Sequence, residues 1–568
     1  MGTSAVQAGQ RYESWLKDPL IDEATKQELE SIRDNEKEIE DRFYKDLEFG
    51  TGGLRGVIGA GTNRMNRYTI RKATQGLAGW LKNTGAGRSL SVVIAHDSRY
   101  GSAEFALEAA LVLAANGITA RVFPSLRPTP ELSFAVRHLK ADAGIVITAS
   151  HNPPEYNGYK VYGADGGQLV PSDAERVYAE IRKVASLADV RITDRESAER
   201  EGRLVWLGEE LDREYIREVA RLSRNRDGAL NRALADIRIV YTPLHGAGNR
   251  LVRMALEAAG MTQVHVVAEQ EHPDPGFSTV KSPNPEEREA FELALRLARE
   301  LDADIAIGTD PDADRMGAAV KHNGEYVLLT GNQAGALMIH YLLESMKSCG
   351  ELPERGAVVK TIVTSELGAK IAESHGLTVF NTLTGFKYIG EKMTQFERSG
   401  DYRFVFGYEE SYGYLAGTYA RDKDAVLASM LICEAAAYYK SLGKSLVDVL
   451  EELYERFGHF RERLESRTYK GKEGMDRMRT LMDQWRAQPP AEVAGSKVAR
   501  MLDYALGIDG LPKENVLKFV LEDGSWFCIR PSGTEPKIKV YFAVCGRSSD
   551  DADERIRRLT ETVMSRLD

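Results

Sequence analysis

The chain has 568 residues, of which 43% are hydrophobic and 28% are charged. This is the composition of an ordinary soluble globular protein, and the length predicts three to five domains because one core stops growing at roughly 250–300 residues. The formal net charge of -10 argues against a nucleic-acid-binding protein, which is normally basic. An anionic small molecule stays open, since arginine and lysine can cluster inside an acidic protein.

The cysteines, at positions 349, 433, 528 and 545, are far apart in the sequence and form no Cys-x-x-Cys pair. They predict neither a zinc site nor a disulfide framework, and reduced thiols favour a cytoplasmic protein. The first 48 residues are charged throughout, and no apolar run reaches the length of a membrane span. We therefore expect no signal peptide, no membrane partner and no nucleic-acid partner. The oligomeric state is not indicated by the sequence.

The first predicted elements are helices. Residues 9–46 have helical spacing with many charges, which predicts an N-terminal helical extension over residues 1–45. A pattern of strand, loop and helix then begins with "LSVVIAHDSR" and "AEFALEAALVLAANG", and two more buried strands, "ARVF" and "AGIVITAS", follow. The same pattern begins again at Ile237 and at Ala357. Strands alternating with helices predict three α/β units of similar size with largely parallel sheets.

The last part of the chain has a different pattern. "VLKFVLEDGSWFCIRPSG" alternates apolar and polar residues around an Asp-Gly turn, which predicts a hairpin. A further strand, "KIKVYFAVCG", and an amphipathic helix, "DDADERIRRLTETVMSRL", complete a smaller α+β domain. The Gln-Pro-Pro at 488–490 lies before these elements and is interpreted as a linker region.

The segment "GTDPDADRMG" places Asp310, Asp312 and Asp314 at the end of an apolar strand. Carboxylates so close repel one another, and a divalent cation would relieve the repulsion; carboxylate oxygens suit Mg²⁺ better than zinc. An EF-hand is disfavoured because its sixth and twelfth positions would be Arg315 and Lys321. The alternative is a solvated acidic turn. A metal site is the favoured prediction because α/β proteins bind ligands at strand ends.

The segment "ITASHNPPEYNGYK" places Ser150 after another buried strand. A serine hydroxyl is a poor nucleophile unless a base or a metal activates it, and His151 and Lys160 are the nearby candidates. The alternative is that Ser150 caps a helix or forms a turn.

Three further stretches have residues suited to anions or sugars. In "RPSGTEPK", at 530–537, Arg530 could grip two phosphate oxygens and two hydroxyls could donate to others, unless the segment is only a rigid turn. In "GYEESYGY", Glu409 and Ser411 suit paired sugar hydroxyls, unless they form an exposed acidic loop. "FGTGGLRG" resembles an anion nest with Arg55. Dinucleotide and P-loop motifs are incomplete in this chain.

From about Asp46 onwards the chain resembles the α-D-phosphohexomutases, the phosphoglucomutase/phosphomannomutase family. The resemblance rests on five motifs in the family's order, "GTGGLRG", "TASHNP", "DPDADR", "GYEES" and "RPSGTEP". The N-terminal extension and the segment "TGFKYIG" are most similar to the long phosphoglucomutase branch, which also includes phosphopentomutases. Phosphomannomutase-type members tend to have a histidine shortly after the sugar-loop serine. Here Tyr412 and Gly413 follow Ser411, which favours the glucomutase-like branch.

The resemblance implies an α/β protein with three similar mixed-sheet α/β domains and a smaller C-terminal α+β domain around a central active-site cleft. Domain 1, residues 46–207, would supply the phosphoserine loop, and domain 2, residues 208–325, the metal-binding loop. Domain 3, residues 326–455, would supply the sugar-binding loop. Residues 456–568 would form the linker region and domain 4, with the phosphate-binding loop.

The resemblance also implies roles for single residues. Ser150 matches the serine that the family carries as phosphoserine, and it would hold one Mg²⁺ together with Asp310, Asp312 and Asp314. Lys160 matches the family's candidate general base, and Lys423 is a candidate for a second acid/base role. The remaining implied residues are His151 and Arg55 for catalysis, and Thr384, Gly385, Lys387, Glu409, Ser411, Lys423, Arg530, Ser532, Gly533 and Thr534 for substrate binding.

The implied activity is that of a phosphoglucomutase, an isomerase that interconverts glucose 1-phosphate and glucose 6-phosphate. The reaction would pass through a phosphoserine enzyme and glucose 1,6-bisphosphate, which also serves as activator. Mannose and pentose phosphates are alternative substrates. A serine-dependent metal phosphatase and a silent sugar-phosphate sensor are alternative functions, although a phosphatase would not need "RPSGTEP" and a sensor would have lost the serine or a metal ligand.

Overall fold

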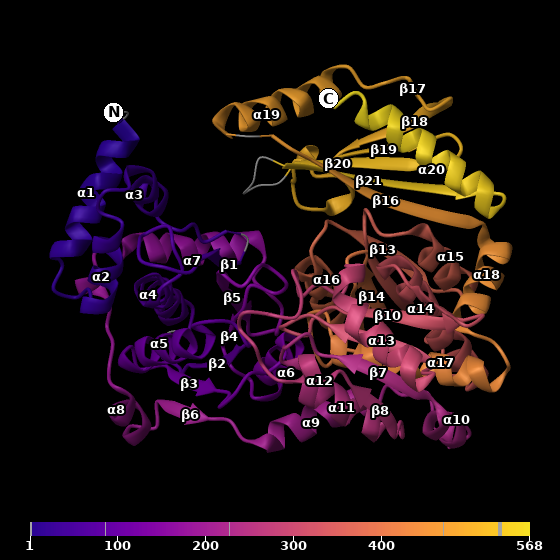
Figure 1. Cartoon of the computed structure of the whole chain (residues 1–568), viewed down its shortest axis with the longest axis horizontal. Coiled ribbons are helices and arrows are strands. Elements are labelled where there is room, and N and C mark those ends of the chain that lie inside the picture. The colour runs from indigo at the N-terminus through magenta and orange to yellow at the C-terminus, as the bar shows by residue number, and fades with distance from the viewer. Residues whose placement is uncertain are drawn as a thin grey trace.

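The computed structural model describes residues 3–50, 52–85, 87–226, 228–469, 471–531 and 537–567. In Figure 1 the N-terminal helices and the first sheet occupy the left side, the second and third sheets the lower right, and the last sheet the upper right. Each sheet forms with the helices beside it one of four domains, preceded by the N-terminal helices.

Three helices form the N-terminal extension: α1 (Thr3–Lys17), α2 (Glu23–Ser31) and α3 (Glu36–Phe43). The side chains of Asp22 and Asn35 cap the second and third helices by accepting from backbone N–H groups. Tyr12, Leu29 and Phe43 are buried in a small core of their own. The extension thereby packs as a separate layer on the first domain.

The first sheet has the strand order β1-β5-β4-β2-β3-β6. Its β4, β2, β3 and β6 run parallel, while β5 is antiparallel to β4, and β1 beyond it is antiparallel to β5. Every residue of β4 is buried, as expected for a strand covered on both faces. The strands are β1 (Gly53–Val57), β2 (Ser91–His96), β3 (Thr119–Val122), β4 (Ala143–Ile147), β5 (Tyr156–Gly163) and β6 (Leu204–Trp206); the helices are α4 (Arg67–Thr84), α5 (Ser102–Ala115), α6 (Thr129–His138), α7 (Pro171–Lys183) and α8 (Arg195–Arg200).

The second and third sheets repeat this plan. In the second, β8, β7 and β9 are parallel, and β10 and β11 continue the sheet antiparallel. Its elements are α9 (Glu209–Ala220), α10 (Asn231–Asp236), β7 (Arg238–Thr242), α11 (Gly248–Ala258), β8 (Gln263–Val266), α12 (Ala268–Glu271), α13 (Glu292–Leu301), β9 (Ile305–Thr309), β10 (Met316–His322) and β11 (Glu325–Leu328).

In the third sheet, β13, β12 and β14 are parallel and β15 is antiparallel. Its elements are α14 (Gly331–Ser348), β12 (Gly356–Thr361), α15 (Glu366–Ser374), β13 (Thr378–Thr382), α16 (Phe386–Ser399), β14 (Arg403–Glu409), β15 (Gly413–Ala416), α17 (Ala425–Ser441) and α18 (Leu446–Phe457). The sheets expected to be largely parallel are thus mixed, because antiparallel strands are added at their edges.

The fourth sheet is antiparallel throughout, with the order β16-β21-β20-β19-β18-β17. The expected Asp-Gly hairpin joins β19 to β20. Residues 488–490 lie between α19 and β17, and β16 before them already belongs to this sheet, so the expected linker is a connection inside the domain. The elements are β16 (His459–Thr468), α19 (Gly471–Ala487), β17 (Glu492–Val493), β18 (Ser496–Asp503), β19 (Leu517–Leu521), β20 (Trp526–Pro531), β21 (Lys537–Gly546) and α20 (Ser549–Met564).

The cores show how firmly the domains are joined. One continuous hydrophobic cluster includes Val93 of the first domain, Ile239 of the second and Tyr408 of the third. The fourth domain has its own core, with Phe519 and Phe527 stacked at its centre. A smaller cluster joins it to the third domain. The first three domains therefore share packed side chains. Within the described residues, the fourth domain meets the third at the smaller cluster and through Phe460, which belongs to the shared cluster.

The part of the chain that the structure describes contains no single helix long and apolar enough to cross a membrane. Helices α17 and α18 would reach that length only together, and they meet at a bend of 87°. The cysteines are free thiols, two of them buried, as expected from their spacing.

Candidate active site

Ser150 lies three residues after the end of β4, in a tight turn that leads towards β5. The Thr148 Oγ1 accepts a hydrogen bond of 2.8 Å from the Ser150 backbone N–H, and Ser150 has a φ of 52°. A non-glycine residue in this left-handed region is strained and is held by its surroundings. No helix begins here, so Ser150 forms a turn and is not a helix cap.

The hydroxyl of Ser150 is directed at the second domain. Its Oγ donates a hydrogen bond of 2.8 Å to Asp310 Oδ2, and it lies 3.1 Å from His151 Nδ1. Ser150 is only 4% exposed. Burial, followed by the charges of Arg315 and Arg55, holds the pKa of His151 well below its usual range, so the imidazole is neutral at pH 7.

Asp310, Asp312 and Asp314 form a buried acidic triad on the loop between β9 and β10. The triad offers ligand oxygens that all lie within 4.8 Å of one another, and none of the three residues is more than 2% exposed. Ala313 adopts a φ of 50°, and the backbone N–H groups of Asp314 and Arg315 donate to Asp310 Oδ1 at 3.1 and 3.0 Å. The loop therefore folds around one of its own carboxylates.

Two lysines from other domains reach the triad. The Lys160 Nζ, from β5, donates a hydrogen bond of 3.0 Å to Asp312 Oδ2, and the Lys423 Nζ lies 3.0 Å from Asp314 Oδ2. Burial and the neighbouring Asp312 raise the pKa of Asp310 well above its usual range. Although burial opposes it, Lys160 keeps the pKa of Asp312 below its usual range. Burial and Asp312 also raise the pKa of Asp314, so the three carboxyls crowd one another and differ in how readily they ionise.

The triad has the features of a site for a hard cation. The Oδ1 atoms of Asp312 and Asp314 are buried, and neither has a hydrogen-bond partner within the described residues. Buried carboxylate oxygens without a partner are costly unless a cation or a proton satisfies them. All the available donor atoms are oxygens, which suit Mg²⁺. The residues present thus fit a divalent cation, and Ser150 Oγ is within reach of the same place.

The predicted sugar-binding residues meet at the end of β14. The Glu409 Oε1 accepts a hydrogen bond of 2.9 Å from the Gly385 backbone N–H, which joins the two sugar-loop segments. Burial raises the pKa of Glu409 to about 7, with Lys423 opposing the shift. The buried Thr384 Oγ1 has no partner among the described residues, and Ser411 is partly exposed beside Glu409. Polar groups are thus available here for a ligand.

Lys423, the candidate for a second acid/base role, lies between two carboxylates. Its Nζ contacts Asp314 and Asp422, the second at 3.2 Å. Although burial favours loss of the proton, these two carboxylates raise the pKa of Lys423. The side chain therefore stays an ammonium, which donates hydrogen bonds and offsets charge.

Arg55 lies on β1 at the edge of the first sheet, and its Nη1 donates a hydrogen bond of 3.1 Å to the Asn152 Oδ1 beyond Ser150. The glycines of "GTGGLRG" permit this approach, because a Cβ on Gly53 would lie 2.2 Å from the Tyr159 carbonyl oxygen. Arg55 and Ser150 are therefore brought to one side of the sheet from positions 95 residues apart.

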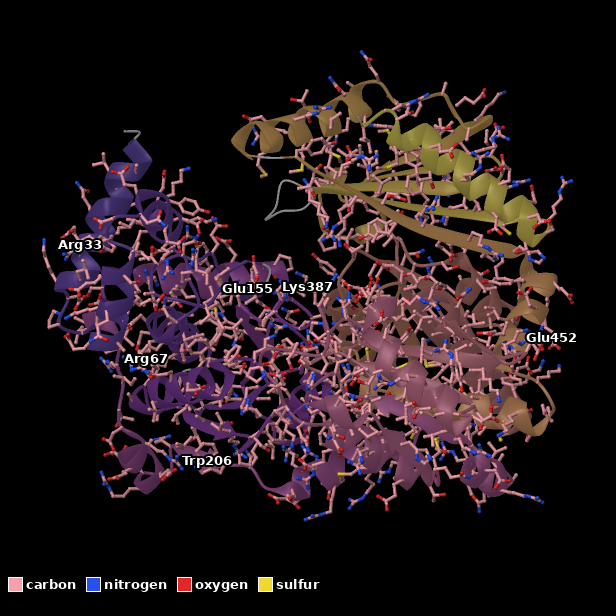
Figure 2. The ribbon with its side chains drawn as sticks, in the orientation of Figure 1. Arg33, Arg67, Glu155, Trp206, Lys387 and Glu452 are labelled. Atoms are coloured by element: carbon pink, nitrogen blue, oxygen red, sulfur yellow. The ribbon has the colours of Figure 1, made fainter. Side chains whose placement is uncertain are left out.

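The predicted phosphate clamp lies at the junction of the third and fourth domains. Arg530, on β20, donates a hydrogen bond of 3.1 Å from its Nε to Glu514 Oε1. Burial lowers the pKa of Lys387 to about 8. The charge of Glu514 opposes this shift and the charge of Arg530 adds to it. Figure 2 labels Lys387 and, on the turn after Ser150, Glu155 towards the middle of the molecule. The predicted residues Ser532, Gly533 and Thr534 lie outside the described residues.

The sequence matches four family models in the order expected. They are described as phosphoglucomutase/phosphomannomutase alpha/beta/alpha domains I, II and III and the C-terminal domain, and they match residues 46–188, 213–324, 330–457 and 481–559. The chain belongs to the phosphoglucomutase/phosphomannomutase family. The resemblance to the α-D-phosphohexomutases and the expected fold class are confirmed, and this phosphohexomutase is an isomerase of the phosphoglucomutase type.

Two relatives that match nearly the whole chain are both named phosphoglucomutase. A phosphoglucomutase of Staphylococcus haemolyticus is 39% identical over 517 residues, which cover 89% of this chain and 91% of that protein. A phosphoglucomutase of Staphylococcus epidermidis is 36% identical, covering 97% and 99%. Among solved structures, a putative phosphomannomutase from Thermus thermophilus is 25% identical with a TM-score of 0.68, covering 92% and 99%. The open form of a Paramecium phosphoglucomutase, parafusin, shares the fold at 18% identity with a TM-score of 0.70, covering 92% and 94%.

Some residues of the mutase's site were not predicted from the sequence. Thr129, at the start of α6, donates a hydrogen bond of 2.9 Å from its Oγ1 to Asp312 Oδ2, and Arg315 forms an ion pair with Glu286. The position of Thr129 after a parallel strand was a usable signal, because such strand ends gather at one edge of the sheet. The partner of Arg315 lies 29 residues away in a loop, and no sequence pattern indicated it.

Proposed function

We propose that this mutase interconverts α-D-glucose 1-phosphate and glucose 6-phosphate, with Ser150 carrying the transferred phosphoryl group. The observation that carries the proposal is the 2.8 Å hydrogen bond between Ser150 Oγ and Asp310, which joins a strained serine to a buried acidic triad in another domain. The relatives named phosphoglucomutase at 36–39% identity support glucose as the sugar.

In the proposed site, Asp310, Asp312 and Asp314 hold one Mg²⁺ together with an oxygen on Ser150. When bound, the ion polarises the phosphorus and offsets negative charge. The free sugar hydroxyl attacks the phosphoserine phosphorus, the bond from phosphorus to Ser150 Oγ breaks, and the hydroxyl proton ends on Ser150. Lys160 and the neutral His151 are the proposed proton carriers, and Arg55 offsets charge on the moving group.

The product of this half-reaction is glucose 1,6-bisphosphate. We propose that it turns round inside the site and returns its other phosphate to Ser150, which is why added bisphosphate would activate the enzyme. Glu409, Ser411, Thr384 and Gly385, with Lys423, would hold sugar hydroxyls that look similar in both orientations. The phosphate that is not transferred would be bound by Lys387, Arg530, Ser532, Gly533 and Thr534.

One incubation separates this proposal from its alternatives. Purified protein is mixed with glucose 1-phosphate, Mg²⁺ and a trace of glucose 1,6-bisphosphate, and the products are assigned by ³¹P NMR. A mutase gives glucose 6-phosphate, a phosphatase gives inorganic phosphate, and a silent sensor gives neither. The Ser150→Ala variant serves as the matched control.

The choice of sugar is tested by a panel of 1-phosphates of glucose, mannose, glucosamine and ribose. We expect the largest kcat/KM for glucose 1-phosphate. Mannose is included because the relative from Thermus thermophilus is named a putative phosphomannomutase. A larger kcat/KM for another sugar would assign that sugar instead and leave the phosphoserine chemistry in place.

A further inference from the structure

Arg99 is a buried arginine close to Ser150 that none of the five motifs includes. It follows β2, and its side chain is fully buried. Its guanidinium donates to four backbone carbonyl oxygens, all of them on the turn between β4 and β5. They belong to Pro153 at 2.8 Å, to Tyr156 at 3.1 Å, and to Ser150 and Asn152.

Two further groups, Asp97 and Phe277, lie against the guanidinium. Asp97 Oδ2 lies 3.3 Å from Arg99 Nε, and Asp97 Oδ1 accepts hydrogen bonds of 2.9 Å from the Arg99 backbone N–H and 2.7 Å from Ser102 Oγ. The ring of Phe277, from the second domain, covers the guanidinium with its centroid 4.9 Å from Arg99 Cζ. Phe277 is 1% exposed. An arginine clamped in this way has one position open to it.

We infer that Arg99 is a positioning residue that holds the Ser150 turn in the strained form needed for phosphoryl transfer. The inference rests on the proposed function for its catalytic consequence. Ser150 is in the left-handed backbone region, which costs free energy unless neighbouring contacts fix it. Four carbonyl oxygens on one rigid fork supply such contacts, and the planar guanidinium can satisfy all of them where a lysine cannot.

The same clamp extends to Arg55. Arg99 binds the Asn152 carbonyl oxygen, while the Asn152 side chain accepts from Arg55 Nη1 at 3.1 Å. A turn that moves therefore displaces the nucleophile and the proposed charge-offsetting arginine together. Phe277 covers Arg99 from the domain that carries the triad, so Arg99 also links the Ser150 turn to the domain of its partner Asp310.

The test replaces Arg99 by lysine, which keeps the positive charge and loses the fork. Backbone hydrogen exchange measures the turn over residues 148–158, and intact mass measures phosphorylation of Ser150 by glucose 1,6-bisphosphate. We expect exchange in the turn to become at least ~10-fold faster, and kcat to fall ~10- to 100-fold, because displacing a reacting group by about 1 Å costs that much. The KM for glucose 1-phosphate should change less than ~3-fold, since the proposed sugar contacts lie in other domains.

Arg224→Lys is the matched control, because Arg224 is buried and paired with Glu351 and Ser345, with no contact to the turn. It should leave both readouts unchanged. Wild-type exchange and kcat in Arg99→Lys would overturn the inference. If Arg99→Lys fails to fold, Phe277→Leu decides with the same readouts, and unchanged exchange in it also overturns the inference. If glucose 1,6-bisphosphate does not phosphorylate Ser150 in the wild type, the proposed function is wrong. Hydrogen exchange in the turn would still test the role of Arg99.

Discussion

At the scale of single residues, the backbone of Ser150 distinguishes this serine as the proposed nucleophile. Many serines end strands, and their neighbours are water or a helix. Here the turn is pulled into a φ of 52° and the hydroxyl is directed at Asp310. A strained backbone that persists in a buried turn indicates that the surroundings specify it, and such residues gather at functional sites.

Removing the hydroxyl of Ser150 should abolish the proposed phosphoenzyme. We expect Ser150→Ala to lose mutase turnover by several orders of magnitude, because the variant lacks the hydroxyl that is proposed to carry the phosphoryl group. Intact mass should show a phosphate adduct on the wild type that the variant lacks. The circular dichroism spectrum should be unchanged, and an active alanine variant would contradict the assignment.

Glu409 should make substrate binding depend on pH near neutrality. Burial raises its pKa from 4.5 to about 7, so lowering the pH from 8 to 6 converts the carboxylate into a neutral acid that binds sugar hydroxyls more weakly. We expect the KM for glucose 1-phosphate to rise over this range. The substrate phosphate also titrates here, so the measurement is made relative to Glu409→Gln, whose KM should lack the carboxylate's contribution.

The same shift predicts an effect on stability with a definite sign. Because the folded pKa lies above the unfolded one, the folded state binds the proton more tightly, and the free energy of unfolding falls as the pH rises from about 4.5 to about 7. A shift of this size corresponds to about 3 kcal/mol. Urea unfolding of Glu409→Gln should show less of this decline than the wild type. An identical pH profile in both would rule out the shift.

The sequence predicted Ser150 and the acidic triad because each follows a strand that reads as fully buried. It did not indicate Arg99 as a partner of the turn, and for Thr129 it offered only a position after a strand, without naming Asp312 as the partner. Arg99 binds a turn 51 to 57 positions later, and Thr129 binds Asp312 across 183 positions. Such contacts are set by which strands lie next to each other, and strand order is not written in the local pattern of apolar residues.

At the scale of elements, the β9–β10 loop brings three carboxylates close together in a buried place. Its carboxylates are buried, two of its oxygens have no partner among the described residues, and two lysines from other domains approach it. The loop is therefore an unstable arrangement for an acidic turn and a favourable one for a cation. The alternative of a solvated acidic turn is wrong, because the triad is not solvated.

Replacing one carboxylate of the triad should weaken the binding of Mg²⁺. We expect Asp312→Asn to raise the Mg²⁺ concentration needed for half-maximal activity and to lower turnover, because it removes a charged ligand. Titration of Mg²⁺ into chelator-treated enzyme measures both effects. Asp304→Asn, at the other end of β9, is the control and should behave as the wild type. Full wild-type activity in excess chelator would exclude the metal site.

The element pattern predicted the strands better than the sheets. Buried runs such as "AGIVI" and "IAIGT" are strands in the structure. The antiparallel strands β5, β10 and β15 change largely parallel sheets into mixed ones. Each returns directly after a site loop, so a short polar loop between two apolar runs was the available signal. The residues of these loops belong to the proposed site, and their sequences are not those of ordinary hairpin turns.

At the scale of the whole molecule, the joint between the third and fourth domains is the place where a separate core begins. The first three domains share one core, while the fourth has a core of its own. Lys518 of the fourth domain donates a hydrogen bond of 2.6 Å to the Ile362 carbonyl oxygen of the third. Beside this contact lies a cavity of about 680 Å³, lined by both domains and formed by none of the proposed site residues. The space leaves room for the fourth domain to tilt.

We expect the fourth domain to close over the substrate and hold the phosphate that is not transferred. Arg530→Lys should then raise KM and lower kcat/KM about ten- to a hundredfold, which corresponds to roughly 1.5–3 kcal/mol for a charged contact. It should also increase the requirement for added glucose 1,6-bisphosphate, because an intermediate that escapes leaves Ser150 without phosphate. Steady-state kinetics with and without bisphosphate measure this. Arg547→Lys, on the same domain, should match the wild type, and wild-type kinetics in Arg530→Lys would contradict the clamp.

The order of strands in the fourth sheet has a consequence for how the protein is made. The first strand of that domain, β16, pairs along its whole length with the last one, β21, from His459 with Gly546 to Thr468 with Lys537. A ribosome therefore releases β16 long before its neighbour exists. During that interval three domains can finish folding, while β16 offers unpaired N–H and C=O groups to any chain nearby. Pairing with β21 ends this exposure along one edge of β16 only, because β16 remains the edge strand of the finished sheet.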